Sequence, residues 1–444
     1  MQAVLTHRSL RKGSILMNKT NTWTAETIAV GSELLLGGRL DTNSLFIADR
    51  LASCGVELRY KTTVGDDLSD IVAALKSAAR RVAVVILTGG LGPTVDDLTR
   101  EAVAHATGHR LTRRKTALDE MTARLASWGR KPNRSQFRQA KIPAGADILS
   151  NPVGTAPGFV LIWKGRFLAA VPGVPREMEP MVTEGVLPRL QHWMDSKKAP
   201  GVVPMVRRVL HTSGIPESLV DEKLTGLIPK GSPIQLGIYA SPMEIMVSLT
   251  GPAAPTQQGV VSIETLFEEA RERLSDVLYG EEDETMESVV GRLLNERKFI
   301  LAVAESCTGG LIGHRLTQVA GSSTYLDRVA VTYSNRAKVQ MLGVPPDVID
   351  RHGAVSAETA AAMARGVRER SGANVGLSVT GIAGPGGATE TKPVGLVYVG
   401  LDGGPNDAFT KEFRFHGGDR TVIKQRSSQA ALDLLRRWLI RKGR

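Results

Sequence analysis

The most informative segment of the chain reads Ile300-Leu-Ala-Val-Ala-Glu-Ser-Cys-Thr-Gly-Gly310. Its first five residues form a continuous apolar run, which is typical of a parallel strand buried on both faces. A helical pattern follows at residues 312–318. A strand, a glycine turn and a helix in this order predict an α/β sheet that presents the hydroxyl of Ser306 at the carboxyl end of a strand.

The same alternation fills the rest of the last third and returns near the start of the chain. In the last third we expect strands at 329–333, 375–379, 395–401 and 411–415, and helices at 288–296, 357–370 and from 420 onward. Near the start we expect strands at 27–30, 58–64 and 82–87, and helices at 44–52 and 71–79. Because parallel strands need helical crossovers, the first region is predicted to be a doubly wound sheet and the last an α/β domain.

The region between them differs. It combines expected strands at 206–211 and 244–249 with expected helices at 217–224 and 265–278, and it holds no set of residues suited to chemistry. This pattern predicts a small α+β domain over 200–280. We therefore expect domains over 23–190 and 285–444 on either side of it, after a disordered tail at 1–22 or a true start at Met17.

Composition limits the classes of function. No apolar run approaches the roughly 20 residues of a membrane span, and the two cysteines, Cys54 and Cys307, make no metal pattern, which fits a reducing cytoplasm. The net charge is +11, but the basic residues are scattered and only 5% of residues are aromatic. Specific nucleic-acid binding is therefore not expected. Apart from the tail, the one basic block is the C-terminal stretch 436–444.

Ser306 is the candidate nucleophile of the last domain. Backbone N–H groups of Thr308, Gly309 and Gly310, at the start of the next helix, are expected to face the group that Ser306 attacks and to form an oxyanion hole. On the residues alone, Ser306 could instead merely cap that helix. Cys307 is the rival nucleophile, and we interpret it as a packing residue.

A serine needs a base to become a nucleophile. The segment Val331-Thr-Tyr-Ser-Asn-Arg-Ala-Lys338 supplies Tyr333 and Lys338 after the next strand. A lysine kept neutral by burial can accept the serine proton. The alternative is that Lys338 is a solvated helix residue.

A glycine-rich loop, Thr380-Gly-Ile-Ala-Gly-Pro-Gly-Gly387, follows another expected strand of the same domain. Glycines let a backbone approach a ligand closely and point amides at a phosphate. Gly381, Gly384 and Gly386 are therefore candidate substrate-binding residues, although any long surface turn has a similar composition.

A second candidate site lies near the start of the chain. The segment Thr88-Gly-Gly-Leu-Gly-Pro-Thr-Val-Asp-Asp-Leu-Thr99 follows an apolar strand and opens a helix. Its loop residues and the first helical amides are expected to form an anion cradle. The candidate binding residues of this loop are Gly89, Gly90, Gly92 and Thr94.

Carboxylates and amides accompany this cradle. Asp96 and Asp97 either cap the helix or hold a divalent metal ion that bridges phosphates, since hard cations prefer oxygen ligands. Glu33 and Asn43, which follow the first strand, add further polar groups. We therefore expect a divalent metal of unknown identity in this domain.

The motifs A-E-S-C-T-G-G, V-T-Y-S-N-x-A-K and V-T-G-I-A-G-P-G-G, in this order, resemble the C-terminal domain of the competence/damage-inducible CinA proteins, and the resemblance covers residues 286–440. That family includes nicotinamide mononucleotide (NMN) deamidases. The resemblance implies Ser306 as nucleophile, Tyr333 and Lys338 as its acid/base partners, and substrate-binding loops at 308–310 and 381–387. It implies no cofactor for this domain.

The motifs G-x-E-L-L-x-G, D-T-N and G-G-L-G-P-T-x-D-D-x-T are similar to the molybdopterin-binding-like domain that begins CinA proteins. This resemblance implies either pterin-type binding or a metal-dependent ADP-ribose pyrophosphatase. We favour the pyrophosphatase, because Asp96 and Asp97 beside a phosphate cradle suit metal-assisted cleavage of a phosphoanhydride.

The middle region corresponds in position to the KH-like domain of CinA proteins. Its nearest match to a nucleic-acid-clamping GXXG loop, Ser213-Gly-Ile-Pro-Glu-Ser218, lacks the second glycine, so we interpret the domain as a structural or dimer-forming spacer. The resemblance thus implies a cytoplasmic homodimer that acts on NMN and ADP-ribose, with no membrane partner. The alternative is a non-catalytic or pterin-binding protein linked to competence or the DNA damage response.

Overall fold

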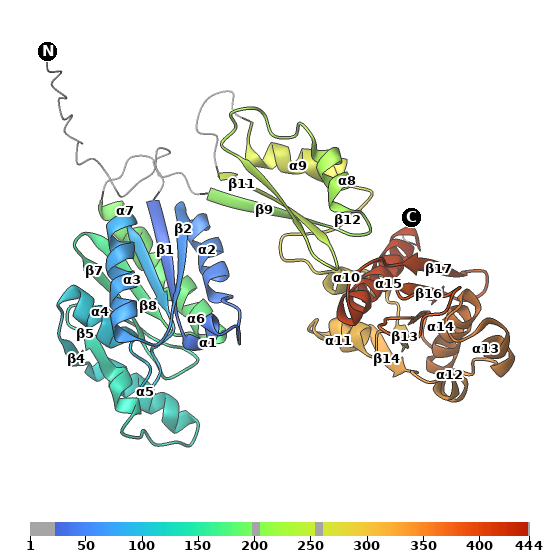
Figure 1. Ribbon diagram of the computed structural model, residues 1–444, viewed down its shortest axis with the longest axis horizontal. Coiled ribbons are helices and arrows are strands. Elements are labelled where there is room, and N and C mark those ends of the chain that lie inside the picture. Colours follow the sequence, from blue (N-terminus) through green and yellow to red (C-terminus); the bar gives the residue numbers. More distant parts are fainter. Residues whose placement is uncertain (1–22, 198–204, 254–260, 443–444) are drawn as a thin grey trace, which may run out of the picture. The chain divides into compact units, whose positions relative to one another are not determined.

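The computed structural model describes residues 23–197, 205–253 and 261–442, which divide into two compact units (Figure 1). The first unit comprises the chain up to residue 207 with residues 251–260, and the second comprises residues 208–250 and 261–444. No helix among the described residues is long and apolar enough to cross a membrane. The tail expected at 1–22 lies outside the described residues.

The first unit contains a six-stranded sheet in the order β2-β1-β3-β8-β7-β6. Its parallel strands are β2 (Val56–Val64), β1 (Trp23–Val30), β3 (Val84–Thr88) and β8 (Arg166–Val171). Strand β7 (Gly158–Trp163) is antiparallel to β8, and β6 (Asp147–Leu149) is antiparallel to β7. The short strands β4 (Leu111–Arg113) and β5 (Lys141–Pro143) form a separate pair. The helices are α1 (Ser32–Leu35), α2 (Asn43–Ser53), α3 (Leu68–Arg81), α4 (Thr99–Thr107), α5 (Lys115–Ser127), α6 (Pro175–Pro180) and α7 (Leu187–Ser196).

Both faces of this sheet are covered. Neighbouring residues of a strand point to opposite faces, and in β3 Ile86 joins a core with Leu51 of α2, whereas Leu87 joins a core with Leu75 of α3. All four side chains are fully buried. The predicted doubly wound fold is therefore confirmed.

The middle region folds as a four-stranded sheet, in the order β10-β11-β9-β12, with two helices. Its elements are β9 (Met205–Thr212), α8 (Glu217–Leu224), β10 (Gln235–Ala240), β11 (Ile245–Pro252), α9 (Ile263–Arg273) and β12 (Leu278–Glu281). The helix expected to reach residue 278 ends at Arg273, because Leu278 belongs to β12 and pairs with Thr212 of β9. Strand β10 was not predicted, since its half-buried residues give no clean alternation.

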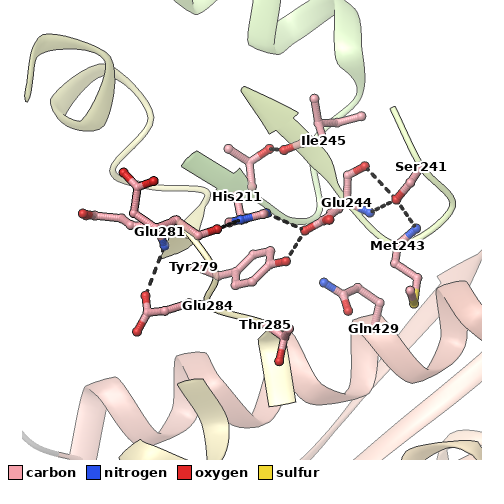
Figure 2. Close-up of polar contacts among 12 residues, drawn as sticks. His211, Ser241, Met243, Glu244, Ile245, Tyr279, Glu281, Glu284, Thr285 and Gln429 are labelled. Atoms are coloured by element: carbon pink, nitrogen blue, oxygen red, sulfur yellow. Dashed lines mark hydrogen bonds and ion pairs between the residues drawn. The ribbon is translucent and has the colours of Figure 1, made fainter. Parts of the chain in front are cut away.

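A polar cluster joins three strands of this sheet (Figure 2). The Nδ1 atom of His211 lies 3.1 Å from Glu244 Oε2, and its Nε2 atom lies 2.7 Å from the backbone oxygen of Glu282. The hydroxyl of Tyr279 donates to the same Glu244 oxygen. The cluster thus ties β9 and β12 to the residue that precedes β11.

The last region contains a five-stranded sheet in the order β14-β13-β15-β16-β17. Strands β14 (Leu326–Val331), β13 (Leu301–Glu305) and β15 (Val375–Gly381) are parallel, and β16 (Leu396–Asp402) and β17 (Ala408–Arg414) are antiparallel additions. The helices are α10 (Met286–Arg297), α11 (Leu311–Thr317), α12 (Asn335–Leu342), α13 (Pro346–His352), α14 (Ala357–Ser371) and α15 (Arg420–Lys442).

This sheet too is buried on both faces, which confirms the predicted α/β class. In β13, Val303 packs in a core with Leu435 of α15, and Ala304 packs in the opposite core with Met363 of α14. The carboxyl ends of the parallel strands therefore lie at one covered edge, where the candidate site is built.

Candidate active site

Ser306 directly follows β13, the middle one of the three parallel strands. Its N–H donates to the oxygen of Val379 in β15 at 2.9 Å, so the neighbouring strand fixes the backbone at this point. The residue is 8% exposed. Ser306 does not cap the next helix, whose N-cap is Gly310. The capping interpretation of Ser306 is therefore wrong.

Lys338 reaches Ser306 from helix α12, which Ser334 caps by accepting a hydrogen bond from the N–H of Ala337. The Nζ atom of Lys338 lies 3.1 Å from Ser306 Oγ, 2.9 Å from the backbone oxygen of Thr332 and 3.4 Å from that of Tyr333. Lys338 is 1% exposed, so the interpretation as a solvated residue is wrong.

This environment favours a neutral amine. Burial lowers the pKa of Lys338 below its usual value. A neutral amine has two N–H donors and one lone pair. When the carbonyl oxygens of Thr332 and Tyr333 accept the two donors, the lone pair faces the hydroxyl of Ser306. The geometry suits a general base beside a serine nucleophile.

Cys307, the rival nucleophile, is 5% exposed and packs in a hydrophobic core. Burial raises the pKa of its thiol to about 12. Because the thiolate is the reactive form of cysteine, this thiol is poorly suited to attack a substrate.

Glu305 is a site residue that the sequence analysis missed. Its side chain is fully buried, and its carboxylate accepts the N–H of Gly310 at 2.9 Å and that of Gly313 at 2.8 Å. The expectation of a free N–H at Gly310 is therefore wrong. A lone acid at the end of an apolar strand is the signal that could have identified it.

The N–H of Gly309 is not free either, since it donates to the backbone oxygen of Ser306 at 3.1 Å. Among the described residues, the N–H groups of Cys307 and Thr308 donate to no backbone oxygen, although both interact with the sulfur of Cys307. They are the candidates for stabilising an oxyanion. The hydroxyl of Thr308 is also buried without a hydrogen-bond partner in the described part of the chain. Such buried orphan groups are rare, and a ligand in the site would explain this one.

Tyr333 is 60% exposed, and its hydroxyl accepts a hydrogen bond from Arg420 Nη2 at 2.6 Å. The other terminal nitrogen of Arg420 donates to the oxygen of Gly384, also at 2.6 Å. The phenol thus faces Arg420, and only the backbone of Tyr333 contacts Lys338. The sequence analysis missed Arg420, because a basic residue at the start of a helix carries no distinctive signal.

A second cation joins Arg420 on the same face of α15. Lys424 follows it by four residues, the spacing that places two side chains side by side on a helix. Its Nζ atom lies 3.7 Å from the position that a Cβ atom would take at Gly309. The turn after Ser306 therefore faces positive charge, which suits an anionic substrate.

The glycine-rich loop has mainly structural reasons for its glycines. A Cβ atom at Gly381 would lie 2.7 Å from Cγ2 of Val397, and one at Gly384, where φ is +78°, would lie 2.7 Å from Cγ1 of Val394. Gly386 has no neighbour within 4 Å at that position. Packing therefore accounts for Gly381 and Gly384, and it leaves Gly386 unexplained.

In the first unit, Asn43 holds together the loops that follow the parallel strands. Its amide nitrogen donates to Thr88 Oγ1 at 2.8 Å and to the oxygen of Gly173 at 2.9 Å. The amide oxygen of Asn43 is buried without a partner among the described residues. This orphan acceptor marks the carboxyl edge of the sheet as a place for a ligand that carries hydrogen-bond donors.

The glycine loop beside Asn43 is not the open cradle that the sequence predicts. The N–H of Gly89 donates to the oxygen of Val171, and those of Gly92 and Thr94 donate to the carboxylate of Asp97 at 2.7 and 2.8 Å. Gly90, at φ +63°, is confined by Thr99, whose Oγ1 atom would lie 2.3 Å from a Cβ there. Most of the loop amides thus stabilise the loop itself.

The acidic residues of this loop do not fit a divalent metal by themselves. Both oxygens of Asp97 already accept loop N–H groups, and Asp96 and Glu33 are exposed. No group of three or more His, Cys, Asp or Glu side chains in the described residues could hold a metal ion. Helix α4 begins at Thr99 without a side-chain cap, so neither aspartate caps it. The metal remains a prediction, and no chemical step is derived from it.

Three family models match the chain. Residues 283–439 match the CinA C-terminal domain, residues 207–280 the damage-inducible protein CinA KH domain, and residues 26–192 the model described as "Probable molybdopterin binding domain". Among solved structures, the competence/damage inducible protein CihA from Agrobacterium tumefaciens is 42% identical, with a TM-score of 0.33, over 34% of this chain and 94% of that chain.

Full-length relatives extend the match. The chain is 42% identical over 420 residues to a CinA-like protein from Acidobacterium capsulatum, which is 94% of this chain and 100% of the relative. It is also 42% identical over 422 residues to a CinA-like protein from Thermosynechococcus vestitus. This match covers 94% of this chain and 99% of the relative. With three domain matches in the family's order and identity of this level along almost its whole length, the chain belongs to the CinA family of competence/damage-inducible proteins.

Proposed function

We propose that the last domain hydrolyses the carboxamide of NMN to nicotinic acid mononucleotide and ammonia. The observation that carries this proposal is the contact of 3.1 Å between Ser306 Oγ and the buried amine of Lys338. A serine paired with a neutral lysine is an arrangement that cleaves amides. The resemblance to the deamidase motifs supplies the substrate.

The reaction proceeds in two steps. Lys338 accepts the proton of Ser306 as Oγ bonds to the carboxamide carbon, and the N–H groups of Cys307 and Thr308 stabilise the oxyanion. The C–N bond then breaks, and protonated Lys338 gives its proton to the departing amine, which leaves as ammonia. Water, deprotonated by Lys338, then attacks the carbonyl carbon of the resulting ester. As the bond between that carbon and Oγ breaks, Lys338 returns the proton to Oγ, which frees Ser306 and the acid product.

Arg420 and Lys424 supply the charge that an NMN phosphate requires. Both belong to the first turns of α15, and Arg420 also bridges Tyr333 and Gly384. Arginine binds phosphate oxygens through paired N–H donors, whereas Lys338 is buried and engaged with Ser306. We therefore assign phosphate binding to the α15 cations and base catalysis to Lys338.

The substrate assignment is tested by ammonia release from NMN, nicotinamide riboside and nicotinamide. We expect release from NMN and at least tenfold lower kcat/KM for the riboside, because only NMN has a phosphate. Arg420→Gln should reduce the preference for NMN over the riboside. Equal rates on NMN and the riboside would contradict phosphate recognition, and no release from any of the three would contradict the amidohydrolase itself.

For the first unit we propose binding and cleavage of ADP-ribose. The orphan oxygen of Asn43 supports a ligand with hydroxyl donors at the carboxyl edge of the sheet. A cavity of about 370 Å³, lined in part by Arg124, Ser150 and Asn151, lies beside α5. The loop that carries Ser150 and Asn151 leads into β7, and the first residues of β7 pair with the end of β8. The cavity therefore lies at the carboxyl edge of the sheet, as Asn43 does.

This proposal is tested by AMP formation from ADP-ribose, with and without a chelator and with each of several divalent metals added back. AMP formation that stops on chelation and returns with a metal would support the pyrophosphatase. A lack of AMP under every condition, with ADP-ribose or a pterin still bound, would favour a binding domain instead.

A further inference from the structure

A cavity of about 500 Å³ opens in the second unit, away from Ser306. The C-terminal half of α15, strand β17 and the turn before β12 form its walls. The residues that line it include Asp276, Phe409, Lys411, Arg436, Arg437 and Arg441. Three arginines of the basic C-terminal stretch, to which the sequence assigned no role, therefore line a cavity.

Two arginines that line the cavity share one acid. Arg436 and Arg437 both contact Asp433, each at 2.7 Å. Asp276, the acid in the wall, is offset by Lys223 at 3.1 Å. Arg436 and Arg437 carry two positive charges against the one negative charge of Asp433, and Lys223 neutralises Asp276. One positive charge of this group is therefore uncompensated.

Two further cations, Lys411 and Arg441, line the cavity. Arg441 lies over the ring of Phe409, with 5.7 Å from Cζ to the ring centroid, and Lys411 lies over the ring of Phe413 at 5.2 Å from Nζ. Both residues are exposed, and neither forms an ion pair with an acid among the described residues. The excess of positive charge around the cavity is thus three.

The rest of the wall is apolar, with Phe409, Leu434 and Ile440. Cavities of about 300–1,000 Å³ with apolar walls and a few charged groups are typical of small-ligand sites. Arginines recognise phosphate, and an aromatic ring offers a flat base a stacking surface. We infer that this cavity binds a small phosphorylated ligand with an aromatic ring, of the class of a nucleoside monophosphate.

This site is distinct from the one around Ser306. Arg420 contacts the catalytic loops from the first turn of α15, whereas Arg437 lines the cavity 17 residues later. At 1.5 Å per residue, the two ends are about 25 Å apart along the helix. A ligand in the cavity therefore does not occupy the substrate site.

The inference is tested on the full chain by amide hydrogen exchange with AMP as the probe, and with adenosine and inorganic phosphate as partial probes. The variant is Lys411→Gln combined with Arg441→Gln. A matched control, Lys76→Gln combined with Arg80→Gln, removes the same charge from exposed positions of α3. Exchange locates the binding, so other nucleotide sites in the chain do not obscure the result.

We expect AMP to slow exchange in β17 in the wild type and in the control, with at least tenfold weaker apparent affinity in the cavity variant. Adenosine and phosphate alone should each protect β17 less than AMP. Absence of protection in β17, or equal protection in the cavity variant, would overturn the inference. Equal protection by a single-stranded oligonucleotide at matched phosphate concentration would overturn it too, in favour of a polyanion surface. Ammonia release from NMN should be unchanged in the cavity variant, so this test is independent of the proposed deamidase.

Discussion

Lys338 is an ionisable side chain that the fold of the last domain holds away from water. A buried amine is unfavourable as a cation, and its lowered pKa shows that the fold leaves that conflict in place. The unfolded chain binds the proton more readily than the folded one, so protonation of Lys338 works against stability. Such a residue is expected where the neutral amine is needed for chemistry.

Lys338→Met should lower kcat for NMN by about 10²–10⁴-fold and change KM less, because it removes the base and keeps the bulk. Lys338→Arg should lower kcat as well, since a guanidinium stays protonated and cannot accept the proton of Ser306. The rate of the wild type should rise with pH through an apparent pKa below that of an ordinary lysine, and Lys338→Met should lose this dependence. A pH–rate profile of ammonia release measures both, and an active Arg variant would refute the base assignment.

Ser306→Ala should abolish ammonia release, because no other hydroxyl contacts Lys338 among the described residues. The matched change one residue away, Cys307→Ala, should keep most of the activity, although it removes packing from a buried position. Thermal unfolding of both variants separates loss of chemistry from loss of folding. If the cysteine variant alone were inactive, the nucleophile would be Cys307.

At the scale of elements, the unit of function is the strand–turn–helix formed by β13, the turn 306–310 and α11. The buried carboxylate of Glu305 ties the turn to the helix through two N–H groups. Because Ser306 is the next residue, the position of its hydroxyl depends on this clamp. Gly309 and Gly310 adopt positive φ values there, which glycine accepts without strain.

Glu305→Gln should destabilise the second unit by about 1–3 kcal/mol, since an amide group would face one of the two N–H donors and leave it unsatisfied. Its effect on kcat should exceed its effect on KM, because the turn positions Ser306 and not Arg420 and Lys424, the cations proposed to bind the phosphate. Urea unfolding and steady-state kinetics provide the two readouts. Glu369→Gln, an exposed carboxylate on α14, is the control and should change neither.

At the scale of the whole molecule, the polar cluster of the middle domain couples stability to pH (Figure 2). Burial disfavours the charged ring of His211, but the hydrogen bonds to Glu244 and to the Glu282 oxygen outweigh it and raise the pKa of His211 above 6.5. Burial likewise disfavours the charged form of Glu244, and the bonds from His211 and Tyr279 nevertheless lower its pKa below 4.5. Arg315 and Glu282 also act on these groups electrostatically.

The sign follows from linkage. A raised histidine pKa stabilises the fold fully below 6.5 and loses that contribution as pH rises through the folded pKa. The lowered pKa of Glu244 stabilises above 4.5 and loses its contribution as pH falls through the folded value. The pair therefore stabilises most between these two values.

His211→Gln should reduce the free energy of unfolding of the second unit by about 1–3 kcal/mol below pH 6.5, with a smaller reduction at about pH 8. Urea unfolding at the two pH values measures the difference. Tyr279→Phe keeps the His211–Glu244 pair, so it should retain the wild-type difference between these two pH values, although it removes a bond that lowers the pKa of Glu244. A His211 variant with the same loss at both pH values would show that the ring contributes packing only.

The sequence by itself determined the two covered sheets, because buried parallel strands require continuous apolar runs and their crossovers require helical periodicity. It also identified Ser306 and Lys338, which lie 32 residues apart and meet at 3.1 Å. Their pairing could be predicted because each residue follows a strand of the same parallel sheet. The ends of parallel strands meet at one edge of the sheet, so the two residues lie close together.

Only the tertiary structure decided what surrounds that pair. The bond between Arg420 and Tyr333 spans 87 residues, and neither residue lies in a local pattern that specifies the other. Glycines predict a turn, but they do not show which groups its N–H donors bind. The N–H of Gly310 donates to Glu305, and those of Gly92 and Thr94 donate to Asp97. Propensity and periodicity are properties of neighbouring residues, whereas burial of an amine and the partners of an amide are set by segments that pack together from distant parts of the chain.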